Sequence, residues 1–416
     1  MNYSHISRFS INLNLKKILI FLSSIIFKIN CKKNFLLKLK SILKTNNIVL
    51  TSQGRSALFY IFKSIISDKK REIIISPYTL PEVIFCIKYS GGTPILVDIN
   101  IETGLLDLES LKKKINSKTA GVIITHLFSD LKNYKNIKKV VKMKSCYLIE
   151  DSAINFGSEY KNNFIGKDSD FVFFSFNLIK NLNLFYGGMI YAKDKYKLNK
   201  IIKSVENLNK FPLKELIKQF FLGTAIYLLN KKLIYNLNSK NLFIWFEKRK
   251  LKYFLKKIYP GKYSKKKNKT PINYSYDFPF YSAKLGLEQL KDFKFENKSR
   301  IRIARKYYKK LFNIDGIIAP KINSKFLISV FLEYPIIVKN NKKVKLYQFL
   351  LSKGIYLRNH WYINSSKYLN TNIKFKNSEY LENNILCLPT HNEISIKYIN
   401  LICDEINNFF SNEAKR

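Results

Sequence analysis

Acidic residues are scarce in this chain: 29 of its 416 residues are Asp or Glu, against 74 Lys and Arg, which gives a formal net charge of +45. Taken alone, such an excess is typical of proteins that bind nucleic acid or anionic membranes. Arginine is scarce too, because 65 of the basic residues are Lys and only 9 are Arg. Surfaces that bind phosphate usually recruit arginine for its bidentate geometry. The favoured interpretation is therefore lysine enrichment by A/T-rich coding, and no nucleic-acid partner is expected.

Cysteine is also rare, and the sequence has no long hydrophobic run. The five cysteines form no Cys-x-x-Cys pair and do not cluster with the four histidines, so we expect no metal site, no disulfide and a reducing cytoplasmic location. Two apolar runs, 18–27 and 220–229, are far shorter than the ~20 residues that a membrane-spanning helix needs. We interpret each run as the buried face of a helix. The alternative is a basic amphipathic anchor on the inner face of an anionic membrane.

Hydrophobic residues nonetheless make up 46% of the chain, which excludes a mostly disordered protein. Between residues 48 and 194, short β-branched runs alternate with segments of helical period. This pattern predicts an α/β fold with a mainly parallel sheet covered on both faces. The expected strands are 73–76, 94–99, 121–126, 146–151, 170–176 and 188–192, and the expected helices are 56–67, 80–89, 108–115 and 137–143. Ligands bind at the carboxyl ends of the strands in such sheets, so candidate site residues follow each run.

The composition divides the chain into four segments. We expect an N-terminal arm (1–46), a large ligand-binding domain (47–204), a helical segment with a basic linker (205–270) and a smaller C-terminal α/β domain (271–416). The last domain is expected to hold a long helix, a strand-like run and two further helices. These are residues 283–312, 326–338, 343–352 and 394–410.

Two candidate sites precede the middle of the large domain. The turn Ser52-Gln-Gly54-Arg-Ser56 opens a predicted helix, whose N–H groups and dipole could seat a phosphate. The ordinary alternative is a serine that caps the helix. Tyr78 follows a predicted strand and could stack on a flat ligand, or it could belong to the core.

Two further candidates lie at later strand ends. Glu150 and Asp151 end one strand, where a carboxylate could hold a proton on a heteroaromatic nitrogen or cap a helix. Ser175 ends the next strand and could bind a phosphate oxygen. Lys180 follows five residues later, shortly before Gly187-Gly188, and could form a Schiff base with an aldehyde if its pKa is lowered. Among 65 lysines, only this spacing singles out Lys180.

The glycine turn, the aromatic residue, the Glu-Asp pair and the Ser…Lys…Gly-Gly motif occur in the order and spacing that resembles the DegT/DnrJ/EryC1/StrS family of pyridoxal-phosphate (PLP) sugar aminotransferases. Further passages are similar to family motifs: Gly92–Asp98, Thr119–His126, Gly166–Asp170, Leu285–Leu290 and Leu388–His391. The resemblance extends from about Asn47 to the C-terminus. It implies the type I aminotransferase fold, PLP as cofactor and a homodimer with the active site at the subunit interface.

The resemblance also implies residue roles. Lys180 would bind the cofactor aldehyde and shuttle the proton, Asp151 would keep the pyridine nitrogen protonated, and Tyr78 would stack on the ring. The phosphate would be bound by the turn at Gly54, by Ser56, by the N–H of Ala57 and by Ser175. Arg358, His360 and Trp361 are candidates for the nucleotide-sugar pocket, because arginine suits a diphosphate and tryptophan suits a base or sugar face.

The implied function is transfer of an amino group, commonly from glutamate, to a nucleotide-linked keto sugar for surface polysaccharide. One alternative is a PLP-dependent sugar dehydratase, and some dehydratase relatives replace the Schiff-base lysine with histidine, unlike Lys180 here. A second alternative is a degenerate, non-catalytic member at the membrane. Retention of Lys180, Asp151 and Ser175 together argues against it.

Three positions depart from the family pattern. Ile154 stands where the family usually carries His or Gln, which removes a polar contact near the cofactor ring. Ser275-Tyr276-Asp277 stands where the family has Asn-Tyr-Arg, so a cation that would reach the neighbouring subunit's phosphate is missing. Tyr186 replaces the usual Glu before the glycine pair. These departures leave the lysine chemistry in place and bear on the substrate.

Overall fold

A seven-stranded sheet forms the centre of the large domain in the computed structural model, which describes residues 7, 10–128, 131–235, 245, 269–322, 327–359, 362–369 and 371–414. The strand order is β1-β10-β9-β6-β5-β2-β4. The strands are β1 (Ile48–Thr51), β2 (Glu72–Ile75), β4 (Thr93–Leu96), β5 (Thr119–Thr125), β6 (Tyr147–Asp151), β9 (Phe171–Ser175) and β10 (Gly188–Ala192). All pairs are parallel except those of β10, which runs antiparallel to both β1 and β9. The predicted mainly parallel α/β sheet is confirmed, and β1 is an additional strand.

Helices cover both faces of this sheet because its strands are apolar on both sides. In β9, Phe171 and Phe173 pack against one helical layer, whereas Val172 and Phe174 face the opposite core. The first layer consists of α3 (Gly54–Ile65), α4 (Pro81–Tyr89) and α7 (Lys195–Glu206). On the opposite face, α5 (Leu108–Lys114) and α6 (Tyr134–Met143) cover β2, β5 and β6. The four helices predicted for residues 56–143 are all present, with ends shifted by a few residues.

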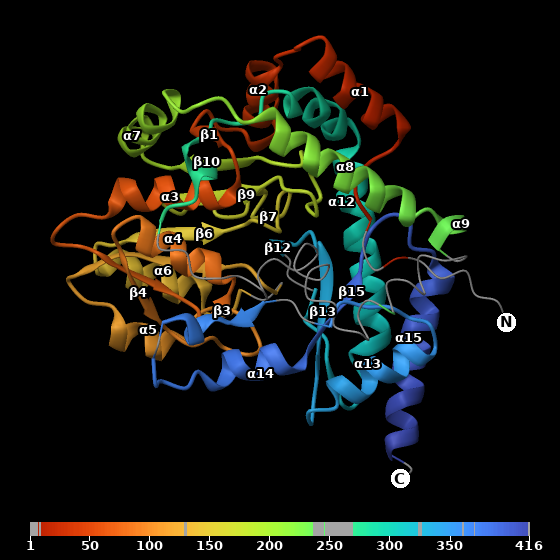
Figure 1. Ribbon diagram of the computed structural model, residues 1–416. Coiled ribbons are helices and arrows are strands. Elements are labelled where there is room, and N and C mark those ends of the chain that lie inside the picture. The colour runs from red at the N-terminus through yellow and green to blue at the C-terminus, as the bar shows by residue number, and fades with distance from the viewer. Residues whose placement is uncertain are drawn as a thin grey trace.

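The N-terminal arm is helical and packs on the large domain. It contains α1 (Leu15–Ile26) and α2 (Lys32–Leu43), which share a core with β1, β9, β10 and α8 (Leu213–Leu229). Figure 1 shows α1, α2 and α8 together along the upper edge of the molecule. The ring of Phe21 on α1 stacks on that of Phe220 on α8, with 4.9 Å between centroids. Both predicted apolar runs therefore bury one face, but Leu19 and Phe221 on their other faces are exposed.

The C-terminal part has its own core, from Ile303 to Phe409. Its three-stranded sheet has the order β11-β13-β15 and is flanked by long helices, at the right of Figure 1. These elements are α12 (Ser282–Leu311), β11 (Ile317–Ile318), β13 (Glu333–Val338), α13 (Lys343–Ser352), β15 (Ile385–Pro389) and α15 (Ile396–Ala414). The predicted strand 326–338 is in fact two strands, because β12 (Leu327–Ile328) leaves it to pair with β7 (Glu159–Tyr160) of the large domain.

The chain returns to the large domain before its last strand and helix. There β14 (Ile363–Asn364) pairs with β3 (Tyr78–Thr79), and α14 (Lys376–Asn384) lies beside it (Figure 1). The Ser378 hydroxyl donates a hydrogen bond of 2.6 Å to the Asp98 carboxylate. The remaining elements are β8 (Asn163–Phe164), α9 (Lys232–Ile234), η3 (Ile272–Ser275) and η4 (Ser365–Tyr368). Most of the predicted segment 205–270 after residue 235 lies outside the described residues.

The start of α12 packs tightly on α2 at a glycine. A Cβ atom added to Gly286 would lie 2.5 Å from the ring of Phe35, which is fully buried. Phe35 also packs on Phe176 and Phe278, so its ring has little room to move. The small residue in the Leu-Gly-Leu-x-Gln-Leu passage is thus required by the contact between the two helices.

We predict that Gly286→Ala destabilises the protein by about 1–3 kcal/mol, because an overpacked core must shift the α2–α12 contact and this outweighs the better helix propensity of alanine. The free energy of unfolding from urea titration measures the effect. Lys294→Ala, at an exposed position of the same helix, is the matched control and should change stability by no more than a few tenths of a kcal/mol. Equal stability of the Gly286 variant and the wild type would contradict the packing argument.

Candidate active site

Five strand ends meet at one edge of the large sheet. The carboxyl ends of β1, β6 and β9 lie next to the amino end of β10, because β10 is antiparallel to its neighbours. Gly188 is opposite both Thr51 and Ser175 in the register. His126 follows β5 on the same edge, and its N–H donates to the carbonyl of Asp151. The topology therefore brings the predicted glycine turn, Asp151 and Ser175 together.

The amino end of α3 is closed by the side chain of Gln53. That side chain accepts the N–H of Ser56, and the Ser56 hydroxyl donates 2.8 Å to the Gln53 carbonyl. The N–H of Ala57 also donates to the Gln53 carbonyl, at 3.1 Å. Both groups are engaged at the start of α3 in this structure, and the predicted phosphate contacts of Ser56 and the Ala57 N–H remain a prediction. The N–H groups of Gly54 and Arg55 have no acceptor among the described residues, and they are the donors that face the edge.

Gly54 brings this helix end against the end of β9. A Cβ atom added to Gly54 would lie 2.9 Å from Cβ of Ser175 and 3.3 Å from its hydroxyl oxygen. Only glycine fits this approach. The two N–H groups at the start of α3 and the Ser175 hydroxyl form a set of donors at a helix N-terminus, an arrangement that binds phosphate.

Asp151 ends β6 as a buried carboxylate. Its Oδ1 atom accepts the N–H of Ala153 at 3.0 Å. Burial raises the pKa of Asp151, and the Ala153 N–H together with the charge of Lys180 opposes that shift. A buried carboxyl of this kind is best kept ionised by a cationic partner, so it suits a protonated ring nitrogen.

Glu150 points to the opposite side of β6, because successive strand side chains alternate. It is fully buried and accepts hydrogen bonds from the Tyr134 and Ser169 hydroxyls, and its Oε2 lies 2.5 Å from Nε2 of His126. Burial would raise the pKa of Glu150, but His126 and the hydroxyl donors lower it further than burial raises it. Of the predicted Glu-Asp pair, only Asp151 reaches the edge of the sheet.

Lys180 lies in the loop between β9 and β10, which α12 holds in place. The Asn183 N–H donates 2.9 Å to Oε1 of Gln289, and Nε2 of Gln289 donates 2.7 Å to the Asn183 carbonyl. The Ser282 hydroxyl donates 2.8 Å to the Leu184 carbonyl. The helix motif that the sequence shares with the family therefore fixes the loop that carries the lysine.

The Lys180 amine is half-buried and has an unusual pKa. Burial lowers the pKa of Lys180 to about 8. The carboxylates of Asp151 and Glu333 raise this pKa, whereas the guanidinium groups of Arg358 and Arg55 lower it. Loss of the proton near neutral pH makes a lysine nucleophilic toward an aldehyde.

Arg358 is half-buried beside the site, in an ion pair of 2.6 Å with Glu333. Burial would lower the pKa of Arg358, but the surrounding groups, Glu333 foremost, together raise it by more. The other two predicted substrate residues, His360 and Trp361, lie outside the described residues. Sequence reasoning missed Glu333, since it sits in a hydrophobic strand without a motif. It also left Arg55 unassigned, although Arg55 stands within the glycine turn.

Tyr78 is fully buried and meets Tyr362 edge to face, with 5.8 Å between ring centroids. Ile154 lies in the same apolar cluster. Because the Tyr78 ring has no exposed surface in this conformation, the structure gives no support to its predicted stacking role. The pairing of β3 with β14 places Tyr362 over this ring, a long-range contact that the sequence does not reveal.

The other departures have local partners. Asp277 forms an ion pair of 2.5 Å with Lys32 on α2, and thereby ties the N-terminal arm to the chain before α12. Tyr186 packs against Phe211 with 4.7 Å between ring centroids. Neither residue is left as an unpaired group in the structure.

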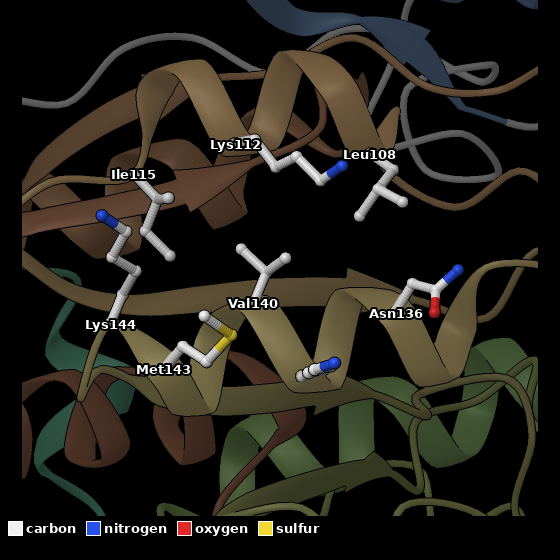
Figure 2. A pocket seen from close by; sticks show the side chains of 8 residues that line it. Leu108, Lys112, Ile115, Asn136, Val140, Met143 and Lys144 are labelled. Carbon is white, nitrogen blue, oxygen red and sulfur yellow. The ribbon is translucent and has the colours of Figure 1, made fainter.

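A pocket between α5 and α6 is separate from this edge. Its volume is about 480 Å³. Figure 2 shows its lining residues: Leu108, Lys112, Ile115, Asn136, Lys139, Val140, Met143 and Lys144. None of them is a predicted site residue, so the chemistry is argued from the strand ends.

The sequence profile of the DegT/DnrJ/EryC1/StrS aminotransferase family matches residues 23–219 and 249–407. The chain belongs to this family. This confirms the predicted resemblance over nearly all of the large and C-terminal domains. The members of this family use PLP as their cofactor.

Individual relatives are more distant. GDP-perosamine synthase of Escherichia coli O157:H7 is 30% identical over 171 residues, which are 40% of this chain and 47% of that protein. Spore coat polysaccharide biosynthesis protein SpsC of Bacillus subtilis strain 168 is 28% identical over 163 residues, 39% of this chain and 42% of that protein. These matches span about half the length of the curated relatives.

The fold is that of solved family structures. The PLP-form of the putative sugar aminotransferase Spr1654 from Streptococcus pneumoniae superposes with a TM-score of 0.73 at 18% identity, over 98% of this chain and 99% of that chain. This confirms the predicted aminotransferase fold.

The residues at the sheet edge fit PLP. The N–H groups of Gly54 and Arg55 and the Ser175 hydroxyl would hold the phosphate, and Asp151 would face the ring nitrogen. Lys180 would bind the aldehyde. The close approach of Gly54 to Ser175 and the burial of Asp151 are the observations that support this fit.

We predict that Lys180 reacts with a small aldehyde at a rate that rises with pH, has its midpoint near pH 8 and levels off above it. The neutral amine is the nucleophile, and it predominates above the pKa of about 8. An ordinary lysine would keep accelerating to its usual pKa of about 10.4. Borohydride trapping of the cofactor-free protein, followed by mass spectrometry of the Lys180 peptide, measures the rate.

Two variants should move this midpoint in opposite directions. Asp151→Asn removes a charge that raises the pKa of Lys180, so the midpoint falls. Arg358→Met removes a charge that lowers it and leaves the Glu333 carboxylate unbalanced, so the midpoint rises. A common midpoint in the wild type and both variants would show that these charges do not act on the lysine.

Proposed function

We propose that the protein is a PLP-dependent sugar aminotransferase. The observation that carries this proposal is the buried edge where Lys180, with its lowered pKa, shares an electrostatic environment with Asp151 next to a phosphate seat. Family membership supports it. A degenerate scaffold would have no reason to keep a buried carboxylate and a desolvated lysine together, since both are costly to bury.

The residues of this chain have distinct tasks in such a reaction. Bound PLP supplies an electron sink for the bonds around the amino-bearing carbon. Asp151 keeps the proton on the ring nitrogen, and the α3 end with Ser175 holds the phosphate. Lys180, as a neutral amine, would take the proton from the amino-bearing carbon of the donor. In the second half of the reaction it would supply a proton to the sugar carbon that receives the amino group.

The proposed substrates are an amino-acid donor, glutamate, and a keto sugar linked to a nucleotide. The names of the relatives support a sugar nucleotide and a polysaccharide end use, since one is a GDP-perosamine synthase and another a spore coat polysaccharide protein. Arg358 is a cation of the right kind for a diphosphate or a donor carboxylate. We further propose a cytoplasmic homodimer with a peripheral contact to the inner membrane face. The net charge of +45 supports the membrane contact alone.

Incubation with glutamate and a panel of nucleotide-linked keto sugars tests this function. We expect an amino-sugar product detectable by mass spectrometry, and a visible absorption band from cofactor bound through lysine. Lys180→Ala should abolish the band and reduce turnover by a factor on the order of 10³ or more. Lys69→Ala, at an exposed position, is the control and should retain both.

Two outcomes would contradict the proposal. The first is a wild-type protein that stays colourless and cannot be reconstituted with PLP. The second is a coloured protein that consumes the keto sugar without forming an amine, which would indicate elimination of water in place of amino transfer.

A further inference from the structure

Two segments outside the family profile pack together. The profile begins at residue 23 and omits residues 220–248. Most of α1, the last ten residues of α8 and all of α9 therefore lie outside the residues that the profile matches. The stacking of Phe21 on Phe220 joins the first two of these segments. We call the outward faces of α1 and α8 the α1–α8 surface.

On α1 the exposed apolar side chains form one stripe. Leu15, Leu19 and Ile26 are exposed, and Leu22 between them is half-buried. Their spacings of four and seven residues place them on one side of the helix, opposite the buried Phe21. The helix is thus apolar on two opposite sides, and only one of them is covered by the protein core.

The outward side of α8 also carries exposed apolar side chains opposite a buried side. Lys214, Lys218, Phe221 and Leu228 lie on one side, at spacings of four and seven residues, and all are exposed. Leu216, Phe220 and Gly223 occupy the opposite, buried side. Leu233 continues the exposed apolar surface into α9.

Helices α1 and α8 and the residues that flank them carry more lysines than acids. Residues 14–29 and 213–231 contain six lysines and one acidic residue, Glu215. Lys16 and Lys17 pair with Glu288 and Glu296 of α12 at 2.6 and 3.9 Å, and Lys218 pairs with Glu215 at 2.6 Å. Lys28, Lys214 and Lys231 are exposed. The charge that these two helices present to solvent is therefore positive.

We propose that the α1–α8 surface docks the enzyme on an anionic lipid bilayer. Exposed leucine, isoleucine and phenylalanine side chains would enter the headgroup boundary, and the surrounding lysines would lie against anionic headgroups. No helix in the described part of the chain is long and apolar enough to cross a membrane. The contact is therefore peripheral, and it gives the proposed membrane location a surface that is independent of amino transfer.

A second copy of the chain fits this surface less well. A symmetric contact sets the same patch against itself, so the exposed Lys28 and Lys214 would meet the like charges of the other subunit. A lipid surface supplies negative charge over a broad area. The combination of exposed apolar side chains and exposed lysines therefore favours lipid.

Vesicle co-sedimentation of the full-length holoenzyme tests the proposal. We expect binding to phosphatidylcholine vesicles that contain phosphatidylglycerol, weak binding to pure phosphatidylcholine, and release by salt. The double variant Leu19→Asp/Phe221→Asp alters side chains that are 57% and 64% exposed, so the fold should tolerate it. It should lower partitioning about tenfold or more, because two large apolar side chains lose their burial in lipid.

The matched control is Val344→Asp/Met143→Asp, on α13 and α6, where the side chains are 59% and 72% exposed. It should bind vesicles like the wild type. The visible cofactor band and aminotransferase activity in solution should be unchanged in both double variants, which separates this test from that of the proposed function. Wild-type protein that ignores anionic vesicles would overturn the proposal. So would equal binding by both double variants, or a Leu19/Phe221 variant whose defect is loss of a dimer in light scattering.

Discussion

The position of Lys180 depends on a two-way hydrogen bond between Gln289 and the backbone of Asn183. The amide of Gln289 both accepts from and donates to this one residue, so the loop between β9 and β10 has a single register on α12. The helix itself is set by Gly286, where α2 and α12 come close enough for Phe35 to fill the space. A packing contact far from any reacting atom thus determines where the amine lies, and the N-terminal arm takes part in building the site.

Burial then determines the chemistry of the groups that this scaffold brings together. It lowers the pKa of Lys180 and raises that of Asp151, so both side chains shift toward their neutral forms. A cationic ring nitrogen beside Asp151 would restore its charge, and an aldehyde would capture the neutral Lys180. Glu333 takes part in the same balance, because its carboxylate pairs with the Arg358 guanidinium and raises the pKa of Lys180, whereas the charge of Arg358 lowers it.

Much of this site could be predicted from the sequence, because its residues stand at the ends of short, apolar strands. Strand ends identified Asp151, Ser175 and the turn at Gly54, and the parallel topology placed them on one edge. The contacts that occupy these side chains could not be predicted in this way. Gln53 closes the start of α3 and accepts hydrogen bonds from Ser56 and Ala57, whereas Tyr362 lies in a distant segment and covers the ring of Tyr78. Strand β15 was missed because it is a short apolar run without a turn signal of its own. The Gln53 contacts are local to the start of α3, whereas the Tyr362 contact joins residues far apart in sequence.

The net charge has two sources that the sequence average conceals. Most of the large domain carries lysines on solvent-facing positions, as coding bias would produce, and several of these pair with nearby acids such as Glu109 and Asp168. Helices α1 and α8 differ, because they combine exposed apolar stripes with lysines and contain a single acid, Glu215. A surface of that kind is costly to leave in water and gains nothing from the reaction at the sheet edge. We therefore infer that this surface contacts a binding partner, and its positive charge indicates an anionic surface outside the protein.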